Sequence, residues 1–350
     1  MRGRGAAGNL PGRFELRPVE PFDDGWGNLE LPIEALPTTV TEEKARTILT
    51  RNQSPDIPFE VSLNPYRGCE HGCAYCFARP SHAYLDLSPG LDFETKLTAK
   101  TNAVERLEKE LRKPGYEVHP IAIGTNTDAY QPIEKRYGLM REILSTLLKF
   151  RHPVTLVTKS AMVLRDLDLL AELASHNLVH VYVSVTTLDA GLARSLEPRA
   201  AAPQRRLQTL SALSEAGVPT GVLAAPMIPA LNDYELEKIA EEAAGRGAGN
   251  LGYILLRLPH EVAPIFEAWL QENVPTKAEH VMSIVRQLRG GKVYDSTWGR
   301  RMRGQGPFAD LLRVRFERVT RRLGLNRQRP ALDLSQFAPP PQRGDQSVLF

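Results

Sequence analysis

The sequence predicts an α/β protein built on an open or partial barrel of parallel strands, with an N-terminal arm and a helical, basic C-terminal extension. Two observations lead to this prediction. Six short apolar runs alternate with longer amphipathic stretches, and all three cysteines of the chain lie in one loop directly after the first run. Repeated strand–helix units imply parallel strands joined by right-handed crossovers. Six units are too few for the usual closed barrel of eight strands.

Residues 1–56 are expected to form the arm, because they are rich in glycine, proline and charged residues and show little periodicity. One helix is expected within the arm, beginning near Thr41, since the carboxylates of Glu42 and Glu43 suit the positive N-terminal end of a helix. The start of the chain is cationic, but no apolar stretch follows it, so we expect no signal peptide.

Residues 57–260 are expected to form the core. Its six strands are the apolar runs at residues 59–63, 118–124, 154–158, 179–185, 218–225 and 251–256. The clearest helices between them have apolar residues at helical spacing and lie at residues 139–150, 164–175, 205–216 and 233–244. Ligands of such folds gather at the C-terminal ends of the strands, which is where the cysteine loop lies.

Residues 261–330 are expected to form the extension, with helices at 262–271, 277–288 and 308–323, and residues 331–350 an extended, loosely held, proline-rich tail. The whole chain has a net charge of +3, but residues 286–329 carry +10 and the remainder −7. A basic region on an acidic body suits an anionic partner, with nucleic acid the first candidate. The alternative is a solvated helix face whose arginines are paired locally.

Three arginines of the extension, Arg300, Arg301 and Arg303, are the candidate phosphate contacts, and Trp298 lies beside them. Arginines next to an aromatic side chain suit phosphate binding combined with base stacking. The same segment equally suits an ordered loop packed against the mouth of the barrel, or a surface that binds an acidic peptide. The sequence leaves these alternatives open.

The cysteines, Cys69, Cys73 and Cys76, are spaced C-x3-C-x2-C, and Tyr75 precedes the third. An iron–sulfur cube normally takes a thiolate on each of its four irons, so three thiolates on one loop leave the fourth iron open for a substrate or cofactor. Clustered, odd-numbered cysteines in a long chain are typical of a metal site in a reducing compartment. Because no segment has the roughly 18 apolar residues of a membrane helix, we expect a cytoplasmic protein without a membrane partner.

A zinc site is the competing interpretation of the cysteines. With His71 or His82 as a fourth ligand they would form a Cys3His site, which is a common structural zinc centre. His71, however, lies between two of the cysteines, where bending back to the same metal would strain the loop. The iron–sulfur interpretation is therefore favoured.

The cysteine spacing, the aromatic residue before Cys76 and the position after the first strand resemble the signature of the radical S-adenosylmethionine (SAM) superfamily. More narrowly, residues 57–260 resemble the bacterial group related to spore photoproduct lyase. The similar segments flank the cysteines or end the second and third strands, at residues 64–68, 92–96, 124–128 and 158–160. The arm motif at residues 2–6 and the extension resemble an uncharacterised subgroup rather than the lyase itself.

This resemblance implies a partial (β/α)6 barrel, a [4Fe-4S] cluster held by the three cysteines, and SAM bound to the open iron. It implies that a one-electron reductant such as flavodoxin or ferredoxin drives SAM cleavage, and that a 5′-deoxyadenosyl radical then abstracts hydrogen from an unidentified substrate, with DNA or RNA as candidates. The alternative from another class is a non-catalytic nucleic-acid-binding protein with a structural iron–sulfur or zinc centre.

Likeness to the family also suggests contacts to SAM at the later strand ends. Thr125, Asn126 and Thr127 are suited to the methionine ammonium, although such residues also form local Asx or Ser/Thr turns. The other candidates each have an implied role: Lys159 for the SAM carboxylate or a ribose hydroxyl, Ser184 for the ribose, Ala225 for the adenine edge and Tyr75, through its backbone, for the adenine. Ser184 equally suits a bond to a local carbonyl, and the Tyr75 ring a shield of the cluster from water.

One departure concerns the hydrogen donor. Spore photoproduct lyase uses a further cysteine, in the loop after its second strand, to return hydrogen to the product radical, and this chain has no fourth cysteine. Tyr130 is the candidate replacement, although a tyrosine beside a proline-containing loop is more often structural. The resemblance therefore carries the fold and the cofactors, but not the substrate.

Overall fold

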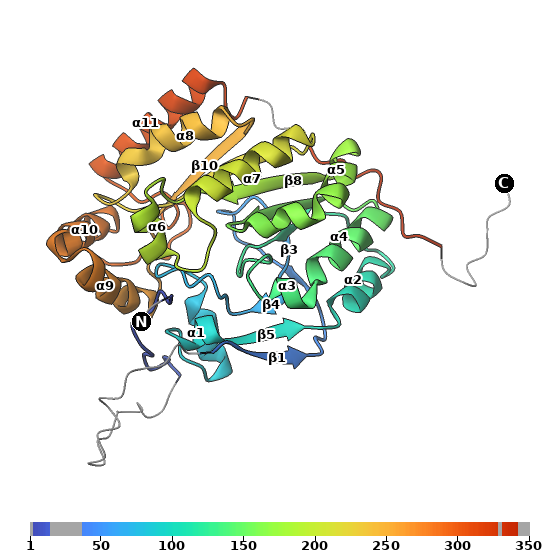
Figure 1. Cartoon of the computed structure of the whole chain (residues 1–350), viewed down its shortest axis with the longest axis horizontal. Helices are drawn as coiled ribbons and strands as arrows, with labels where there is room; N and C mark the ends of the chain where they lie inside the picture. Colours follow the sequence, from blue (N-terminus) through green and yellow to red (C-terminus); the bar gives the residue numbers. More distant parts are fainter. Residues whose placement is uncertain (1–2, 15–36, 328–330, 342–350) are drawn as a thin grey trace, which may run out of the picture.

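The protein is described by a computed structural model that covers residues 3–14, 37–327 and 331–341. Its centre is an open, seven-stranded sheet in the order β10-β9-β8-β7-β6-β3-β2 (Figure 1). Six of its strands, β3 and β6 to β10, are parallel, and β2 pairs with β3 at the edge in the antiparallel direction. The strands of this sheet are β2 (Leu49–Arg51), β3 (Val61–Leu63), β6 (Ile121–Ile123), β7 (Val154–Thr158), β8 (Val179–Ser184), β9 (Thr220–Met227) and β10 (Asn250–Leu255).

The partial parallel barrel expected from the sequence is thus confirmed, with every expected strand present. The strands are rich in valine, isoleucine and leucine because helices cover the sheet, and such strands are nearly continuous apolar runs. The crossover helices are α4 (Leu139–Lys149), α5 (Leu167–Ser175), α7 (Pro203–Glu215) and α8 (Leu236–Ala244), with the short α3 (Glu134–Tyr137) and α6 (Ala190–Leu196) between strands. Their apolar faces join the strands in one continuous core.

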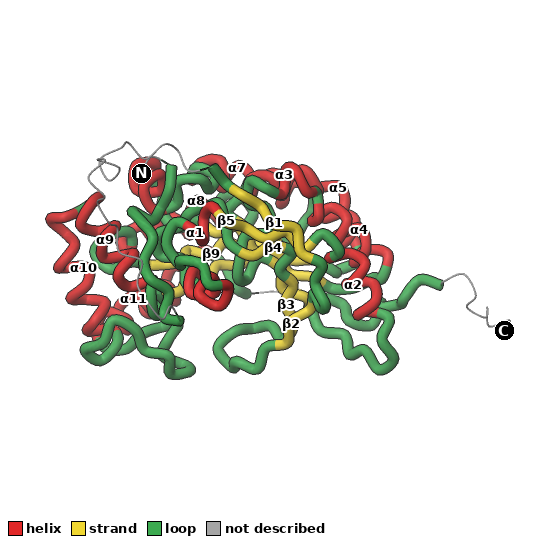
Figure 2. Tube along the Cα trace, turned by 90° about the horizontal axis from the view of Figure 1, so that it is seen from below, coloured by secondary structure: helices red, strands yellow, loops and turns green. Residues whose placement is uncertain are grey.

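The helix expected near Thr41 is wrong, because this segment is a strand. β1 (Thr39–Glu43) pairs in parallel with β5 (Lys96–Lys100), which pairs on its other side with β4 (Tyr66–Arg67), and together they form a small three-stranded sheet (Figure 2). The first three residues of β1, Thr39, Val40 and Thr41, are β-branched and favour an extended backbone. The free edge of β5 decides the outcome, because it supplies hydrogen-bond partners along the whole of β1.

Two short helices, η1 (Arg79–Leu85) and α1 (Asp92–Thr95), follow the cysteine loop. α2 (Ala103–Leu111) comes later in the chain and packs against α4. The first described part of the arm, residues 3–14, runs beside η1 and α1 through bonds such as that from the Leu10 amide to Ser88 Oγ, 3.0 Å.

The three helices expected in the extension are confirmed as α9 (Val262–Asn273), α10 (Pro275–Leu288) and α11 (Pro307–Leu323). α9 buries Phe266 and Trp269, and α10 buries Val281, in an apolar cluster that also contains Cys73 and Tyr75, so both helices support the cysteine loop. α11 lies along α8 (Figure 1), and its Phe316 ring packs 4.8 Å from Tyr253 of β10. The extension therefore completes one end of the barrel.

The described part of the tail, residues 331–341, is extended but not loosely held. Phe337 packs between Tyr116 and His152, with ring centroids 5.4 Å apart in each case. The Ala338 amide donates to Phe150 O at 3.1 Å, and Arg112 donates to Pro340 O at 2.8 Å. Among the described residues, no helix combines the length and apolar character required to span a membrane.

Candidate active site at the cysteine loop

The loop that carries the three cysteines is shaped by two glycines and by backbone hydrogen bonds. Gly68 and Gly72 have φ angles of 72° and 65°, which side chains other than glycine rarely adopt. The Cys69 amide donates to Phe93 O at 2.9 Å, and the Cys76 amide to Cys73 O at 3.2 Å. The loop is therefore held in one conformation without help from a disulfide.

A buried arginine supports this loop from behind. Arg79 donates through Nε to Cys73 O at 3.0 Å and through Nη1 to Gly90 O at 2.8 Å, and its Nη2 pairs with Glu94. Both charged side chains are fully buried. Sequence analysis missed this pair, although Arg79 lies three residues after the last cysteine and Glu94 lies within one of the segments that carry the resemblance.

The three thiols suit an iron–sulfur cluster. All are free, Cys69 and Cys73 are buried and Cys76 is half-buried. Burial raises the pKa of the Cys69 and Cys73 thiols, so cluster binding must displace their protons, as it does wherever thiolates ligate metal. Three adjacent thiols on one rigid loop match the donor set that a cube with one open iron requires.

The two histidines that a zinc site would need have other partners. His71 Nδ1 lies 3.3 Å from Asp128 Oδ2, and His82 Nε2 lies 2.9 Å from Lys96 O. Within residues 3–14, 37–327 and 331–341, no three or more His, Cys, Asp or Glu side chains are grouped as ligands of one metal ion. In a cube, by contrast, each thiolate binds a different iron.

Asp128 joins the ends of the second and third parallel strands to the cysteine loop. It accepts from Thr158 Oγ1 and from the Lys159 amide, both at 2.7 Å, and it also contacts the Tyr130 amide and His71. Burial alone would raise the pKa of Asp128, but His71 and the donated hydrogen bonds outweigh it and hold the pKa below its usual value. The carboxylate is therefore charged and fixes where Lys159 leaves its strand.

Lys159 and Tyr75 lie close together beside the cysteine loop. The Lys159 ammonium is 5.9 Å from the centre of the Tyr75 ring. The Tyr75 hydroxyl donates to Glu197, which also accepts from Thr186 Oγ1 at 2.6 Å and pairs with the buried Arg206. Burial acts to raise the pKa of Glu197, but the Arg206 and Lys159 cations lower it below its ordinary value. This places a fixed negative charge beside Lys159.

Glu197, Arg206 and Thr186 were not predicted from the sequence. Thr186 follows Ser184 by two residues at the end of β8, and that position was the available signal. Nothing in the order of residues indicates that Glu197, which follows α6, meets Arg206 of α7 beside Tyr75.

The three candidate residues after β6 differ in their hydrogen bonds and in their exposure. The Asn126 and Thr127 amides donate to Asn64 Oδ1 at 3.2 and 3.5 Å, and Thr127 Oγ1 donates to Tyr66 O at 3.1 Å. The hydroxyl of Thr127 is thus engaged in local structure, as the turn alternative expects. Asn126 is exposed, and Thr125 is half-buried beside it.

Ser184 and Ala225 lie on neighbouring strands, and Ser184 Oγ donates to Ala225 O over 3.4 Å. Thr186 Oγ1, which donates its proton to Glu197, lies 3.1 Å from the same carbonyl. The local-carbonyl alternative for Ser184 is thus realised through a long hydrogen bond.

Tyr130 belongs to a different network. Its side chain is 1% exposed, and its hydroxyl donates to Asp166 Oδ2 at 3.0 Å. Arg165 and Arg141 bind the same carboxylate, at 2.8 and 3.4 Å. As a hydrogen donor, Tyr130 would have to give up this bond, so its placement favours a structural role.

Comparison with known proteins shows what this chain resembles. Residues 63–243 match the Radical SAM superfamily. An uncharacterized protein of Mycobacterium tuberculosis strain H37Rv is 38% identical over 233 residues, which are 66% of this chain and 68% of that protein. An uncharacterized protein of Methanocaldococcus jannaschii is 28% identical over 236 residues, 67% of this chain and 84% of the other.

Two solved structures share the fold. Spore photoproduct lyase complexed with dinucleoside spore photoproduct has a TM-score of 0.61 at 14% identity, over 81% of this chain and 79% of the lyase. A mutant of the lyase with bound AdoMet and dinucleoside spore photoproduct has a TM-score of 0.60 at 14% identity, over 83% and 85%. The resemblance expected from the sequence is thereby confirmed for the fold.

Proposed function

The chain belongs to the radical SAM superfamily, and on that premise we propose that it is a hydrogen-abstracting enzyme whose substrate carries phosphate groups. It uses the cofactors of that superfamily, a [4Fe-4S] cluster and SAM. When bound, they supply one-electron reductive cleavage of SAM and a 5′-deoxyadenosyl radical. The observation that carries the proposal is the loop of three free, adjacent thiols that lies beside Lys159, Tyr75 and Glu197.

The proposed roles follow from the surroundings of each residue. Cys69, Cys73 and Cys76 hold three irons and leave the fourth open to SAM. Lys159, oriented by Asp128 and Glu197, binds the SAM carboxylate or a ribose hydroxyl. Glu197 keeps the Tyr75 ring in place through the tyrosine hydroxyl, so that the backbone of Tyr75 is fixed for the adenine.

The other SAM contacts are proposed at the ends of the later strands. Thr125 and Asn126 are assigned to the methionine ammonium, and Ser184 and Ala225 to the ribose and adenine. The Thr127 hydroxyl does not contact SAM in this proposal, because it stabilises the loop by donating to Tyr66 O. A one-electron donor such as flavodoxin or ferredoxin is part of the proposal, because reductive cleavage consumes one electron.

A phosphate-bearing substrate, with nucleic acid the first candidate, is supported by the basic surface of the extension. Arg300 and Arg303 are exposed, and Trp298 is 60% exposed next to them. Arg301 instead binds Asp56 Oδ2 at 2.6 Å, so it anchors this segment to the core and is less suited to a phosphate.

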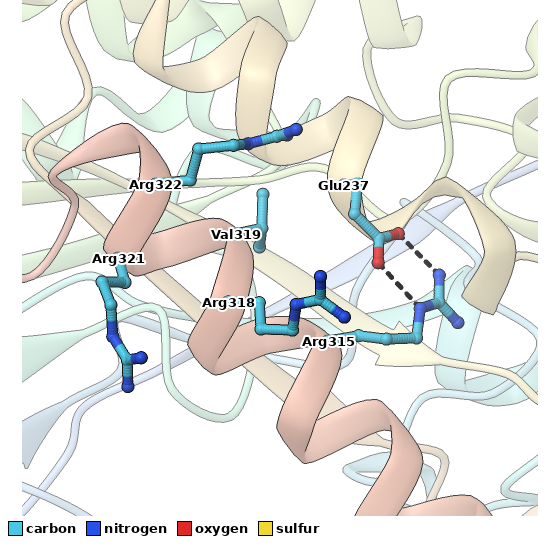
Figure 3. A pocket seen from close by; sticks show the side chains of 6 residues that line it. All are labelled: Glu237, Arg315, Arg318, Val319, Arg321 and Arg322. Carbon is cyan, nitrogen blue, oxygen red and sulfur yellow. Dashed lines mark hydrogen bonds and ion pairs between the residues drawn. The ribbon is translucent and has the colours of Figure 1, made fainter.

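A second basic feature is a groove of about 500 Å³ between α11 and α8 (Figure 3). It is lined by Glu237, Val319 and four arginines, Arg315, Arg318, Arg321 and Arg322. Arg315 also donates to Asp233 O at 3.0 Å, and the neighbouring Asn232 donates to Thr186 O at 2.7 Å. One loop thus connects the groove with the residues around Tyr75.

The test of the proposed function is reductive cleavage of SAM. Protein reconstituted with iron and sulfide under anaerobic conditions should contain four irons per chain and release 5′-deoxyadenosine when it is reduced. Cys→Ala at Cys69, Cys73 or Cys76 should each abolish the release, because each thiolate binds its own iron. Unreduced wild-type protein is the control.

The competing function, a nucleic-acid-binding protein with a structural metal centre, gives the opposite result. It would release no 5′-deoxyadenosine under any of these conditions. Stoichiometric zinc in protein purified without oxygen, together with no iron-dependent cleavage after reconstitution, would contradict the enzyme.

A further inference from the structure

We propose that the N-terminal arm is part of the cluster site: residues 4–6 clamp the cysteine loop through Glu94 and keep water from the cluster. This inference rests on the proposed function for the presence of the cluster. It assigns a positioning role to a segment that precedes the barrel and that carries the RGRGA motif of residues 2–6.

The arm completes the hydrogen bonding of a buried carboxylate. Glu94 is 0% exposed and accepts from the Gly5 amide through Oε2 at 3.0 Å and from the Ala6 amide through Oε1 at 2.9 Å. The same carboxylate pairs with Arg79, whose Nε holds Cys73 O. A buried charge is stable only when it is paired and hydrogen-bonded, so the arm, Glu94, Arg79 and the cysteine loop form one connected unit.

The backbone of the arm lies directly on the cysteine loop. A Cβ atom at Gly5 would be 1.6 Å from Gly72 O and 3.1 Å from the Ala74 nitrogen, both of them backbone atoms that have no room to move aside. Only glycine allows this approach. Gly72 and Ala74 flank Cys73, so the arm covers the loop between the first two cysteines.

A second set of bonds fixes the arm on its other side. Arg4 donates to Glu94 O at 2.9 Å and to Thr38 Oγ1 at 3.1 Å, and Thr38 donates to Glu70 Oε1 at 2.6 Å. Glu70 directly follows Cys69 and also pairs with Arg199, 3.1 Å away. Arg4 therefore connects the arm to the loop next to the first cysteine as well.

The arm remains in place when single contacts are weakened, because it is anchored further along. Asn9 and Asp92 exchange two hydrogen bonds of 3.1 Å, and Ala6 packs in an apolar cluster with Leu91 and Ile265. A substitution at Gly5 is thus expected to lift the arm from the cysteine loop locally while the rest of the arm stays attached.

The test compares two glycines of the same arm in the full-length protein. Gly5→Ala introduces the clash with Gly72, whereas Gly8→Ala is the matched control, because a Cβ atom at Gly8 would meet nothing within 4 Å. Both variants are reconstituted anaerobically. The readouts are the rate at which the visible absorbance of the cluster disappears in air and the midpoint potential of the cluster.

Gly5→Ala should lose its cluster roughly tenfold faster than the wild type, which is the usual size of an effect exerted through groups that support metal ligands. Its midpoint potential should become less negative, because water stabilises the more highly charged reduced cluster. Gly8→Ala should match the wild type in both readouts, and circular dichroism should show all three proteins folded.

Equal air stability and equal potential in Gly5→Ala and Gly8→Ala would overturn the inference and leave the proposed function intact. If Gly5→Ala does not fold, Arg4→Ala replaces it, since that change removes the bonds to Glu94 O and Thr38 without a clash. The same two outcomes then decide. A wild-type chain that assembles no cluster would overturn both the inference and the proposed function.

Discussion

Lys159 lies near Cys73 of the cysteine loop and near the buried carboxylate of Glu197, and both affect its pKa. Burial acts to lower its pKa, but Cys73 and Glu197 outweigh this effect and raise the pKa above its ordinary value. The ammonium is therefore charged near neutral pH. A fixed cation at the end of a parallel strand, held by Asp128 through its own amide, is suited to a carboxylate ligand.

Lys159→Ala should weaken SAM binding by roughly tenfold or more, because a hydrogen bond to a charged group contributes about 1.5–3 kcal/mol. Ser184→Ala should have a smaller effect, since its hydroxyl already has a partner in Ala225 O. The measurement is calorimetric titration of reconstituted protein with SAM, accompanied by iron analysis.

The iron content should be unchanged in both variants, as neither residue is a proposed ligand. Lys149→Ala, an exposed lysine at the end of α4, is the matched control and should bind SAM normally. Wild-type affinity in both test variants would move SAM away from these strand ends.

At the scale of elements, α11 shows which arginines of the basic region are already ion-paired and which are available to a partner. Arg315 binds Glu237 at 2.6 Å and Arg322 pairs with Glu241, so both attach α11 to α8. Arg313 pairs with Glu317 on its own helix. Arg318 and Arg321 are exposed and form no ion pair with any residue of the described ranges. The net charge of this region therefore overstates the number of free guanidinium groups.

Arg318→Ala together with Arg321→Ala should flatten the salt dependence of nucleic-acid binding. Each phosphate contact contributes roughly 0.7–0.9 to the logarithmic slope, so the double variant should lose about 1.4–1.8 units. The measurement is fluorescence anisotropy of a single-stranded DNA or RNA oligonucleotide over a series of salt concentrations. Arg313→Ala is the matched control from the same helix.

The double variant of Arg300 and Arg303 distinguishes the two basic surfaces. A change of slope in this variant alone would locate the phosphates at the Trp298 segment, and a change in the α11 variant alone would locate them in the groove. Binding of neither oligonucleotide by the wild type would contradict a nucleic-acid substrate and favour the locally paired arginines.

At the scale of the whole molecule, the tail covers the loops that lead into β7 and β8, where it contacts Phe150, His176 and Asn177. Phe337 covers His152, which is fully buried. Its Nδ1 lies 3.0 Å from Pro153 O, a pure acceptor, so Nδ1 carries the proton and Nε2 accepts from the Tyr116 hydroxyl at 2.8 Å. Burial lowers the pKa of His152 to about 4. The imidazole is thus neutral in the folded protein.

This arrangement predicts a loss of stability in mild acid. The pKa of an unfolded histidine is about 6.5, so between pH 6.5 and about 4 the unfolded chain binds a proton that the folded chain does not. The free energy of unfolding should fall by about 2 kcal/mol from pH 7 to pH 5 on account of His152, with no contribution above pH 7.

The measurement is urea denaturation at both pH values. His152→Gln should be less stable at pH 7 but should lose correspondingly less on acidification. His280→Gln, at an exposed histidine of α10, should follow the wild type. Identical pH dependence in all three proteins would show that His152 does not titrate as its burial requires.

Sequence patterns predicted the core strands well because each strand is a short, separate apolar run that helices cover. They failed for β1, where Glu42 and Glu43 suggested a helix but the edge of β5 imposed a strand. They also predicted the cysteines and Lys159, whose spacing or strand-end position is visible along the chain. Glu94 and Glu197 could not be found in this way, because their contacts with Gly5 and Tyr75 join segments that lie far apart in the sequence.

By itself, the sequence determined the fold class through its apolar periodicity, and its resemblance to the radical SAM superfamily implied the cofactors. Only the tertiary structure decided that Gly5 meets Gly72, that Glu94 pairs with Arg79, and that Arg301 is occupied by Asp56. Buried polar groups must find partners wherever the chain brings them together. Which partner each one finds depends on the packing of distant segments, and no local pattern records it.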